Sequence, residues 1–425
     1  MKLMVSIDEH YIAARGRIYC TEGTTPYEFF RRAYLKVFDQ VIVLARVRWD
    51  ERFAGRPEAI SDGPNVEFFP LPDFRGPYQY VTVRRGLLAC IREAIHKADA
   101  YVLRGPGIIG NFLASEVQRA GKSYAAQVLG DPQEVYGPGR VGGFLRWFYR
   151  PVLSGRQKRI CWNAVAVSYV TRSTLQRRYP ASPGAFAASW SDAQIEGAIA
   201  TQGELEKRLR SISELANRPA VLGFVGSLAQ PYKGADVLLR AIALCRVQGL
   251  KVVARLVGCG RLLSEYQGLA KELGVADDVE FLGRLGAGGP VFQFLDSVDL
   301  FVMPSLTEGL PRAMIEAMAR GCPCIGSNVG GIPELLAPDD LVKPGDPAAL
   351  AKEIMQKLAS QLELARMARR NRDEARNYAP EYAQASEFAF LHAIHNQAIV
   401  GTSKAFAKDR TLGIRPARQS RSCSS

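Results

Sequence analysis

The chain lacks the features that mark several special classes of protein. Its 425 residues contain only 8 cysteines and 4 histidines, and no stretch approaches the roughly 20 uncharged apolar residues of a membrane-spanning helix. The cysteines are scattered, and the only close pair, Cys322 and Cys324, is a poor metal signature. We therefore expect buried thiols in a reducing compartment. Met1–Cys20 mixes acids and bases into its apolar residues, so no signal peptide is expected.

Acidic residues are missing from one long segment. Val135–Ser191 contains no Asp or Glu but nine Lys or Arg, and Gly401–Ser425 carries a net +5. These two segments together exceed the whole-chain charge of +13. The positive charge therefore belongs to two places, and an anionic partner is expected there. No recognition helix, zinc finger or RNA-binding signature accompanies the charge, so nucleic acid is not the predicted partner.

A short aromatic and basic stretch lies inside the acid-free segment. Helical spacing over 143–150 places Arg146 and Arg150 on one face, with Phe148 opposite and Trp147 at its flank, before Pro151 is expected to end the helix. Such a helix suits either an anionic membrane surface or a core-facing position with solvated arginines. The absence of acids favours the membrane surface.

The remaining composition, 47% hydrophobic and 23% charged, is that of a globular protein of two or three domains. Short β-rich runs alternate with helical stretches twice along the chain, which predicts two doubly wound α/β domains with a cleft between the carboxyl ends of their sheets. The predicted regions are a first domain over 1–190, a connection over 191–218, a second domain over 219–375, a helix returning to the first domain over 376–400, and a basic, disordered tail over 401–425.

Three loops of the second half follow predicted strands and precede predicted helices. They span Gly226–Gly234, Gly258–Gly260 and Thr307–Pro311, and Lys233 adds a positive charge to the first. Glycines let backbone N–H groups approach a ligand, and helix N-termini present such groups to anions. A phosphate-bearing ligand is therefore predicted, although glycine turns after strands are common in α/β folds.

Glu316 is the only polar residue of Ala313–Ala319. A buried carboxylate needs hydrogen-bond donors, and ligand hydroxyls would serve. The alternatives are a solvent-facing side chain or a pair with Arg312 or Arg320. Glu308 could complement a helix dipole, or form a glycosidase pair with Glu316, but the phosphate-type loops argue against a hydrolase.

These residues resemble a known family. Glu308–Glu316 is similar to the E-x7-E motif of the retaining family 4 glycosyltransferases. The neighbouring motifs agree in order and spacing, over Tyr232–Leu239, Leu256–Gly260, Val279–Gly283, Met303–Ser305, Ala317–Gly321 and Gly330–Glu334. The match covers about Leu222 to Asp346, and the first half more loosely resembles transferases of surface-polysaccharide assembly. The resemblance implies the GT-B fold, two Rossmann-like doubly wound domains that face a central cleft.

The resemblance also implies roles for individual residues. Glu308 would contact the donor sugar, Lys233 would stabilise the departing diphosphate, Glu316 would bind the ribose hydroxyls, and the amides of Gly309 and Leu310 would hold the diphosphate. The other implied donor-binding residues are Gly226, Ser227, Gly258, Gly260, Gly283 and Arg284. The leaving phosphate would take the acceptor proton, so that neither a protein nucleophile, nor a metal, nor a cofactor is expected.

Two positions depart from the family pattern. Ser227 stands where members often have an arginine that shares the diphosphate. The first domain has no histidine at the end of a central strand, where Arg104 stands instead, and Asp131 is expected to face the acceptor.

We therefore expect a hexosyltransferase-type glycosyltransferase of cell-surface polysaccharide biosynthesis, cytoplasmic and peripheral to the inner face of the membrane. Its partners would be a nucleotide-sugar donor, a glycan or lipid-linked glycan acceptor on the first domain, and an anionic membrane surface. The alternative is a catalytically silent nucleotide-sugar-binding partner of another transferase.

Overall fold

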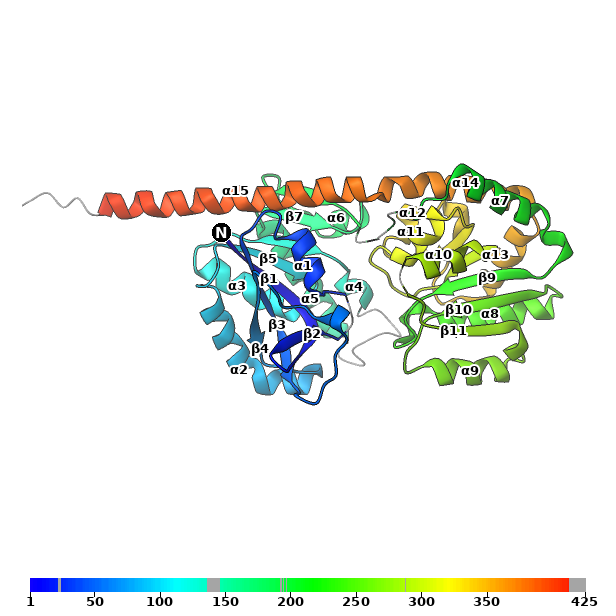
Figure 1. Cartoon of the computed structure of the whole chain (residues 1–425), viewed down its shortest axis with the longest axis horizontal. Coiled ribbons are helices and arrows are strands. Elements are labelled where there is room, and N and C mark those ends of the chain that lie inside the picture. The colour runs from blue at the N-terminus through cyan, green and yellow to red at the C-terminus, as the bar shows by residue number, and fades with distance from the viewer. Residues whose placement is uncertain are drawn as a thin grey trace, which may run out of the picture.

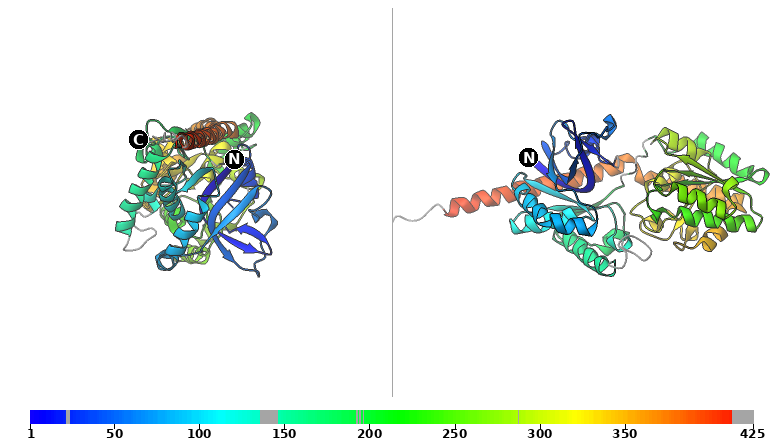
Figure 2. Two further views of the ribbon diagram at one scale, coloured as in Figure 1. Left: turned by 90° about the vertical axis from the view of Figure 1, so that its left-hand side faces the viewer. Right: turned by 90° about the horizontal axis from the view of Figure 1, so that it is seen from below.

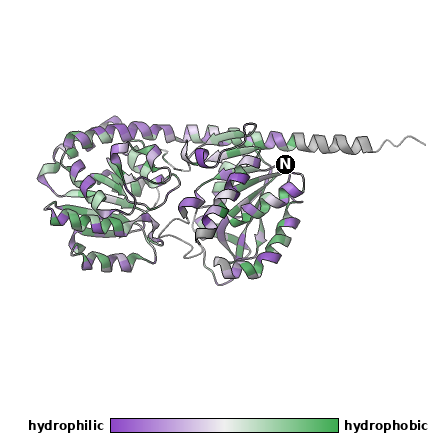
Figure 3. Ribbon diagram, turned by 180° about the vertical axis from the view of Figure 1, so that it is seen from behind, coloured by the Kyte–Doolittle hydropathy of each residue, from purple (hydrophilic) through white to green (hydrophobic). Residues whose placement is uncertain are grey.

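The computed structural model describes residues 1–21, 24–135, 146–191, 193, 195, 197–286 and 288–412. They form two α/β domains that lie side by side, with one long helix running from the second domain along the first (Figure 1). Two further views show that this helix stays on one side of the pair (Figure 2). Hydrophobic residues concentrate on the strands inside each domain, and hydrophilic residues on the outer helices (Figure 3).

The sheet of the first domain has the order β4-β3-β1-β5-β6-β7-β8, with β2 paired to β1. All its pairings are parallel except β1 with β2. Its strands are β1 Lys2–Ala14, β2 Arg17–Cys20, β3 Gln40–Trp49, β4 Val66–Leu71, β5 Ala100–Gly105, β6 Ala125–Val128, β7 Ala166–Tyr169 and β8 Phe186–Ser189. The strand order reverses direction between β1 and β5, which is where a doubly wound sheet opens a crevice for ligands.

Helices cover both faces of this sheet. They are α1 Tyr27–Ala33, α2 Gly76–Ala94, α3 Ile108–Arg119, α4 Pro132–Val135, α5 Arg146–Asn163 and α6 Thr174–Arg178. Leu87 of α2, Leu113 of α3 and Cys161 of α5 share one buried cluster. Phe30 of α1 shares the opposite cluster with Phe390 of the long C-terminal helix. Because both faces are buried, the strands read as continuous apolar runs rather than as an alternation.

The second domain has a parallel sheet of order β11-β10-β9-β12-β13-β14, the strand order of a dinucleotide-binding fold. Its strands are β9 Ala220–Val225, β10 Val252–Val257, β11 Val279–Gly283, β12 Leu300–Met303, β13 Cys324–Ser327 and β14 Leu341–Val342. Its helices are α7 Gln202–Ser213, α8 Ala235–Val247, α9 Leu263–Glu272, α10 Gly289–Asp296, α11 Arg312–Ala319, α12 Ile332–Leu335, α13 Pro347–Leu358 and α14 Gln361–Ala375. The direction reverses between β9 and β12, which pair with Leu300 opposite Leu222.

The segment between the domains and the C-terminal helix join the two halves. Helix α7 packs on the second domain, where the buried Arg208 donates hydrogen bonds to the carbonyls of Leu295, Val298 and Arg320. Helix α15, Pro380–Leu412, returns along the first domain and packs Phe390 near Trp190. It includes residues 401–412 of the predicted tail, and residues 413–425 lie outside the described part of the chain.

One expectation about local structure is wrong. Pro151 does not end a helix, because α5 runs from Arg146 to Asn163 with Pro151 inside it. Proline removes one backbone donor near the start of this helix, and the buried side chains of Ser154, Gln157 and Cys161 hold the later turns against the domain. No helix in the residues that the structure describes is both long and apolar enough to cross a membrane.

Candidate active site

Loops from three strands of the second domain meet at the carboxyl edge of the sheet. The Gly226 N–H donates to the Val257 carbonyl at 3.0 Å, and the Gly258 N–H donates to the Gly283 carbonyl at 2.8 Å. A Cβ on Gly258 would lie 1.9 Å from the Gly226 carbonyl oxygen, and one on Gly260 would lie 2.0 Å from the Ala229 nitrogen. Glycine at these positions therefore lets the loops lie one against another, and the predicted glycine residues form one rim.

Lys233 and Glu308 form an ion pair at the point where the strand order reverses. Lys233 ends a short turn after β9, and Glu308 lies in the loop after β12. Lys233 Nζ lies 2.8 Å from Glu308 Oε1, which also accepts a hydrogen bond from the Ser305 hydroxyl at 2.7 Å. The Lys233 side chain is 18% exposed and that of Glu308 is 7% exposed. The Lys233 ammonium is thus held by Glu308 at the carboxyl end of the sheet, with the Lys233 side chain beside Gly226.

Glu316 lies on α11, among completely buried neighbours such as Ile315 and Ala317. Its side chain is half-buried, and within the described residues it has no hydrogen-bond or ion-pair partner. Burial raises the pKa of its carboxyl, which the charge of Arg312 partly opposes. Arg320 pairs instead with Asp296 and Glu204, so the alternative of an Arg320–Glu316 pair is excluded. The carboxylate remains available to ligand hydroxyls.

The other predicted donor-binding residues lie in the loops that follow β9, β11 and β12. Ser227 is exposed, and its hydroxyl accepts a hydrogen bond from the Ala229 N–H at 3.3 Å. Arg284 is exposed after β11, and Leu310 packs against a core cluster of the second domain. A Cβ on Gly309 would lie 2.6 Å from the Leu129 carbonyl oxygen of the first domain. Gly309 therefore lies where the two domains touch.

Two carboxylates that the sequence reasoning did not single out join the domains across this contact. Glu334 of the second domain accepts hydrogen bonds from the N–H groups of Arg172, Ser173 and Thr174 at 2.6, 3.1 and 2.5 Å, and from the Ser173 hydroxyl at 3.1 Å. Burial acts to raise the pKa of Glu334, but these hydrogen bonds outweigh it and the pKa is lowered. The second carboxylate, Glu134, belongs to the first domain, and it accepts hydrogen bonds from Thr307 and Gly330 of the second domain.

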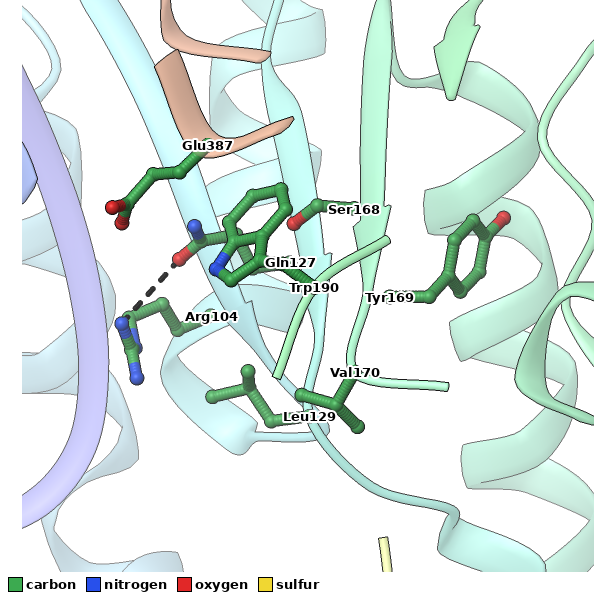
Figure 4. Close-up of a pocket in the computed structure, with 8 residues that line it drawn as sticks. All are labelled: Arg104, Gln127, Leu129, Ser168, Tyr169, Val170, Trp190 and Glu387. Carbon is green, nitrogen blue, oxygen red and sulfur yellow. Dashed lines mark hydrogen bonds between the residues drawn. The ribbon is translucent and has the colours of Figure 1, made fainter. Parts of the chain in front are cut away.

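The carboxyl edge of the first sheet carries a small pocket. It is lined by Arg104, Gln127, Leu129, Ser168, Tyr169, Val170, Trp190 and Glu387 (Figure 4). Arg104 lies at the end of β5, 4.6 Å over the ring of Phe29, and its guanidinium donates to Tyr34 Oη at 3.3 Å and to Gln127 Oε1 at 3.5 Å. Arg104 thus lies at the carboxyl end of β5, and Glu387 reaches the same pocket from α15; a contact of Arg104 with an acceptor stays a prediction.

Asp131 follows β6 on the same edge, and it is buried. Its carboxylate accepts hydrogen bonds from the Gln133 N–H at 2.8 Å and from Tyr179 Oη, and it pairs with Arg178. These contacts tie α4 to α6 within the first domain. Its contact with an acceptor stays a prediction.

The predicted membrane-surface residues fall at the start of α5. The side chains of Arg146, Trp147 and Phe148 lie outside the described part of the chain, whereas Arg150 is exposed. Further along the same helix the structure exposes Arg156, Lys158, Arg159 and Trp162. The described length of α5 therefore presents a basic face that includes one aromatic ring. Among the described residues, no three His, Cys, Asp or Glu side chains are grouped to hold a metal ion.

Known proteins are similar to this chain in the sequence of its second domain and in its fold. Residues 219–360 match the family described as glycosyl transferases group 1. The whole fold is similar to the crystal structure of HepE of Anabaena in complex with UDP, with a TM-score of 0.58 and 20% identity over 95% of this chain and 99% of that one. The chain therefore has the GT-B fold, and residues 219–360 of its second domain are similar to group 1 glycosyl transferases.

Relatives cover the chain to different extents. Protein CapJ of Staphylococcus aureus is 25% identical over 335 residues, which are 77% of this chain and 79% of that protein. A GDP-mannose-dependent alpha-(1-6)-phosphatidylinositol monomannoside mannosyltransferase of Mycolicibacterium smegmatis is 31% identical over 197 residues, 44% of this chain and 50% of that protein. The glycosyltransferase resemblance and the GT-B fold are therefore confirmed.

Proposed function

We propose that the chain is a retaining, hexosyltransferase-type glycosyltransferase that moves a sugar from a nucleotide-sugar donor to a glycan. The observation that carries this proposal is the Lys233–Glu308 ion pair beside the half-buried Glu316 carboxylate, at the crevice of a group 1 glycosyltransferase domain. The family resemblance assigns the departing diphosphate to Lys233, the donor sugar to Glu308 and the ribose to Glu316.

Each residue has one task in this proposal. The Glu316 carboxylate accepts hydrogen bonds from the ribose hydroxyls, and the Glu308 carboxylate contacts the donor sugar. The bond between the anomeric carbon and the diphosphate oxygen breaks, while a bond to the acceptor oxygen forms on the same face. The acceptor proton passes to the leaving diphosphate, whose growing negative charge Lys233 stabilises. Charge stabilisation of this kind is usually the largest catalytic contribution, and here it needs no metal ion.

We place the acceptor on the first domain, on the side of Arg104 and Asp131, which lie at or just after the carboxyl ends of strands of its sheet. A lipid-linked glycan in cell-surface polysaccharide biosynthesis is the proposed acceptor. The match to an enzyme named for a phosphatidylinositol mannoside acceptor supports a lipid, and the exposed basic face of α5 supports an anionic membrane surface. The enzyme would then work at the cytoplasmic face of the membrane.

A thermal-shift panel of nucleotide sugars tests the donor site. A donor at 100 times its Kd stabilises a protein by about 2.7 kcal/mol, so the correct nucleotide sugar should raise the Tm clearly and the others should not. Glu316→Gln should reduce this shift. Lys251→Ala, an exposed lysine just before β10 at the opposite edge of the same sheet, should retain it. The proposal is wrong if no nucleotide sugar stabilises the wild-type protein.

A further inference from the structure

The second domain already holds an anion at its crevice, and that anion is a side chain of the first domain. Glu134 lies on α4, and its Oε1 accepts a hydrogen bond from the Gly330 N–H at 3.0 Å. Its Oε2 accepts one from the Thr307 hydroxyl at 3.2 Å. Arg178 of its own domain lies 3.8 Å from Oε1, and the Glu134 side chain is 16% exposed. The carboxylate is therefore sequestered among donors and a positive charge.

These donors lie directly beside the catalytic pair. Thr307 is the residue before Glu308, and a Cβ on Gly330 would lie 2.0 Å from the Glu308 carbonyl oxygen. Gly330 also has a φ of 55°, so glycine is favoured there both by backbone conformation and by space. The Glu134 carboxylate thus occupies N–H and O–H donors next to the residue whose own carboxylate pairs with Lys233.

A diphosphate would compete with a carboxylate for these N–H and O–H donors. Both accept hydrogen bonds from N–H and O–H groups, and like charges in one partly buried site repel each other. We propose that Glu134 is an internal competitor of the donor's diphosphate, and so sets the affinity of the site for nucleoside diphosphates. This inference rests on the proposed function, because it assumes that the diphosphate binds at this crevice. On diphosphate binding, Glu134 would leave the loop and remain with Arg178.

Titration calorimetry with UDP, GDP and ADP tests this inference. Glu134→Gln keeps the shape of the side chain and removes its charge. It should bind the preferred nucleoside diphosphate about tenfold more tightly than wild type, the factor that corresponds to about 1.4 kcal/mol. At about 1 M salt, where charges are screened within about 3 Å, the difference should shrink. Glu93→Gln neutralises an exposed acid on α2 and should bind as wild type does.

The outcomes separate this inference from the proposal beneath it. If wild type binds a nucleoside diphosphate and Glu134→Gln binds it equally or more weakly, Glu134 only links the domains and the inference is overturned. The proposed function then still stands. If wild type binds none of the three nucleotides by calorimetry, the proposed donor site falls, and the inference falls with it.

Discussion

The contact between Glu334 and the backbone of residues 172–174 should control how firmly the two domains hold together at this point. In Glu334→Ala the three N–H groups lose their carboxylate, and nothing else in α12 can replace it. A hydrogen bond to a charged group contributes about 1.5–3 kcal/mol, and such contributions are not additive. We take about 2 kcal/mol for the cluster, which corresponds to roughly a thirtyfold shift in the local opening equilibrium.

Hydrogen exchange at the amides of Arg172, Ser173 and Thr174 measures this opening directly. Exchange should accelerate roughly thirtyfold in Glu334→Ala, and less in Glu334→Gln, which keeps one acceptor oxygen. Glu280→Ala, which removes a more exposed acid of the same domain, should leave these amides unchanged. Because the pKa of Glu334 is lowered in the folded protein, its contribution is present above the ordinary pKa of 4.5 and is lost as pH falls through the lower folded value. Unchanged exchange in Glu334→Ala would refute this reasoning.

Three further predictions concern other parts of the molecule. Gly258→Ala would drive a methyl group against the Gly226 carbonyl, so the Tm should fall by several degrees and donor binding should be lost, as thermal denaturation with and without nucleotide would show. Burial raises the pKa of Asp8 from 3.8 to about 6. The free energy of unfolding should therefore fall as pH rises between these two values. Asp8→Asn should flatten the dependence of Tm on pH over this range. The double variant Arg156→Glu and Arg159→Glu reverses two exposed charges on α5. It should sediment less with anionic vesicles at physiological salt and should bind nucleotide as wild type does. Equal sedimentation would contradict the proposed membrane surface.

The sequence predicts the second domain more closely than the first for a physical reason. The expected bounds of β9, β10 and β12 agree with the structure, because these strands are buried runs of apolar residues bounded by turn residues. No strand is expected at β2, β8 or β14, because their residues are only partly buried and form no continuous apolar run. The sequence also predicts a helix end at Pro151. Helix α5 continues past it, because buried side chains of its later turns pack against the domain.

Some contacts of the candidate site can likewise be predicted from the sequence, and others cannot. Lys233 and Glu308 lie 75 positions apart, yet each follows a strand beside the reversal of strand order, so a doubly wound fold brings them together. Glu334 lies in a recognisable motif, but its partners lie in the other domain, 160 to 162 positions away. Glu134 meets Gly330 over 196 positions. Contacts between domains leave no periodicity or spacing in the sequence from which they could be predicted.

Sugar transfer itself tests the central claim most directly. Nucleoside diphosphate release should be measured from UDP-, GDP- and ADP-sugars with a panel of glycan and lipid-linked glycan acceptors, for wild type, Lys233→Ala and Lys251→Ala. We predict acceptor-dependent release from one donor class, with kcat/KM lowered at least roughly hundredfold in Lys233→Ala and unchanged in Lys251→Ala. The account is contradicted if Lys233→Ala transfers at the wild-type rate, or if the wild-type protein binds a donor and releases no nucleotide with any acceptor, which would identify a silent binding partner.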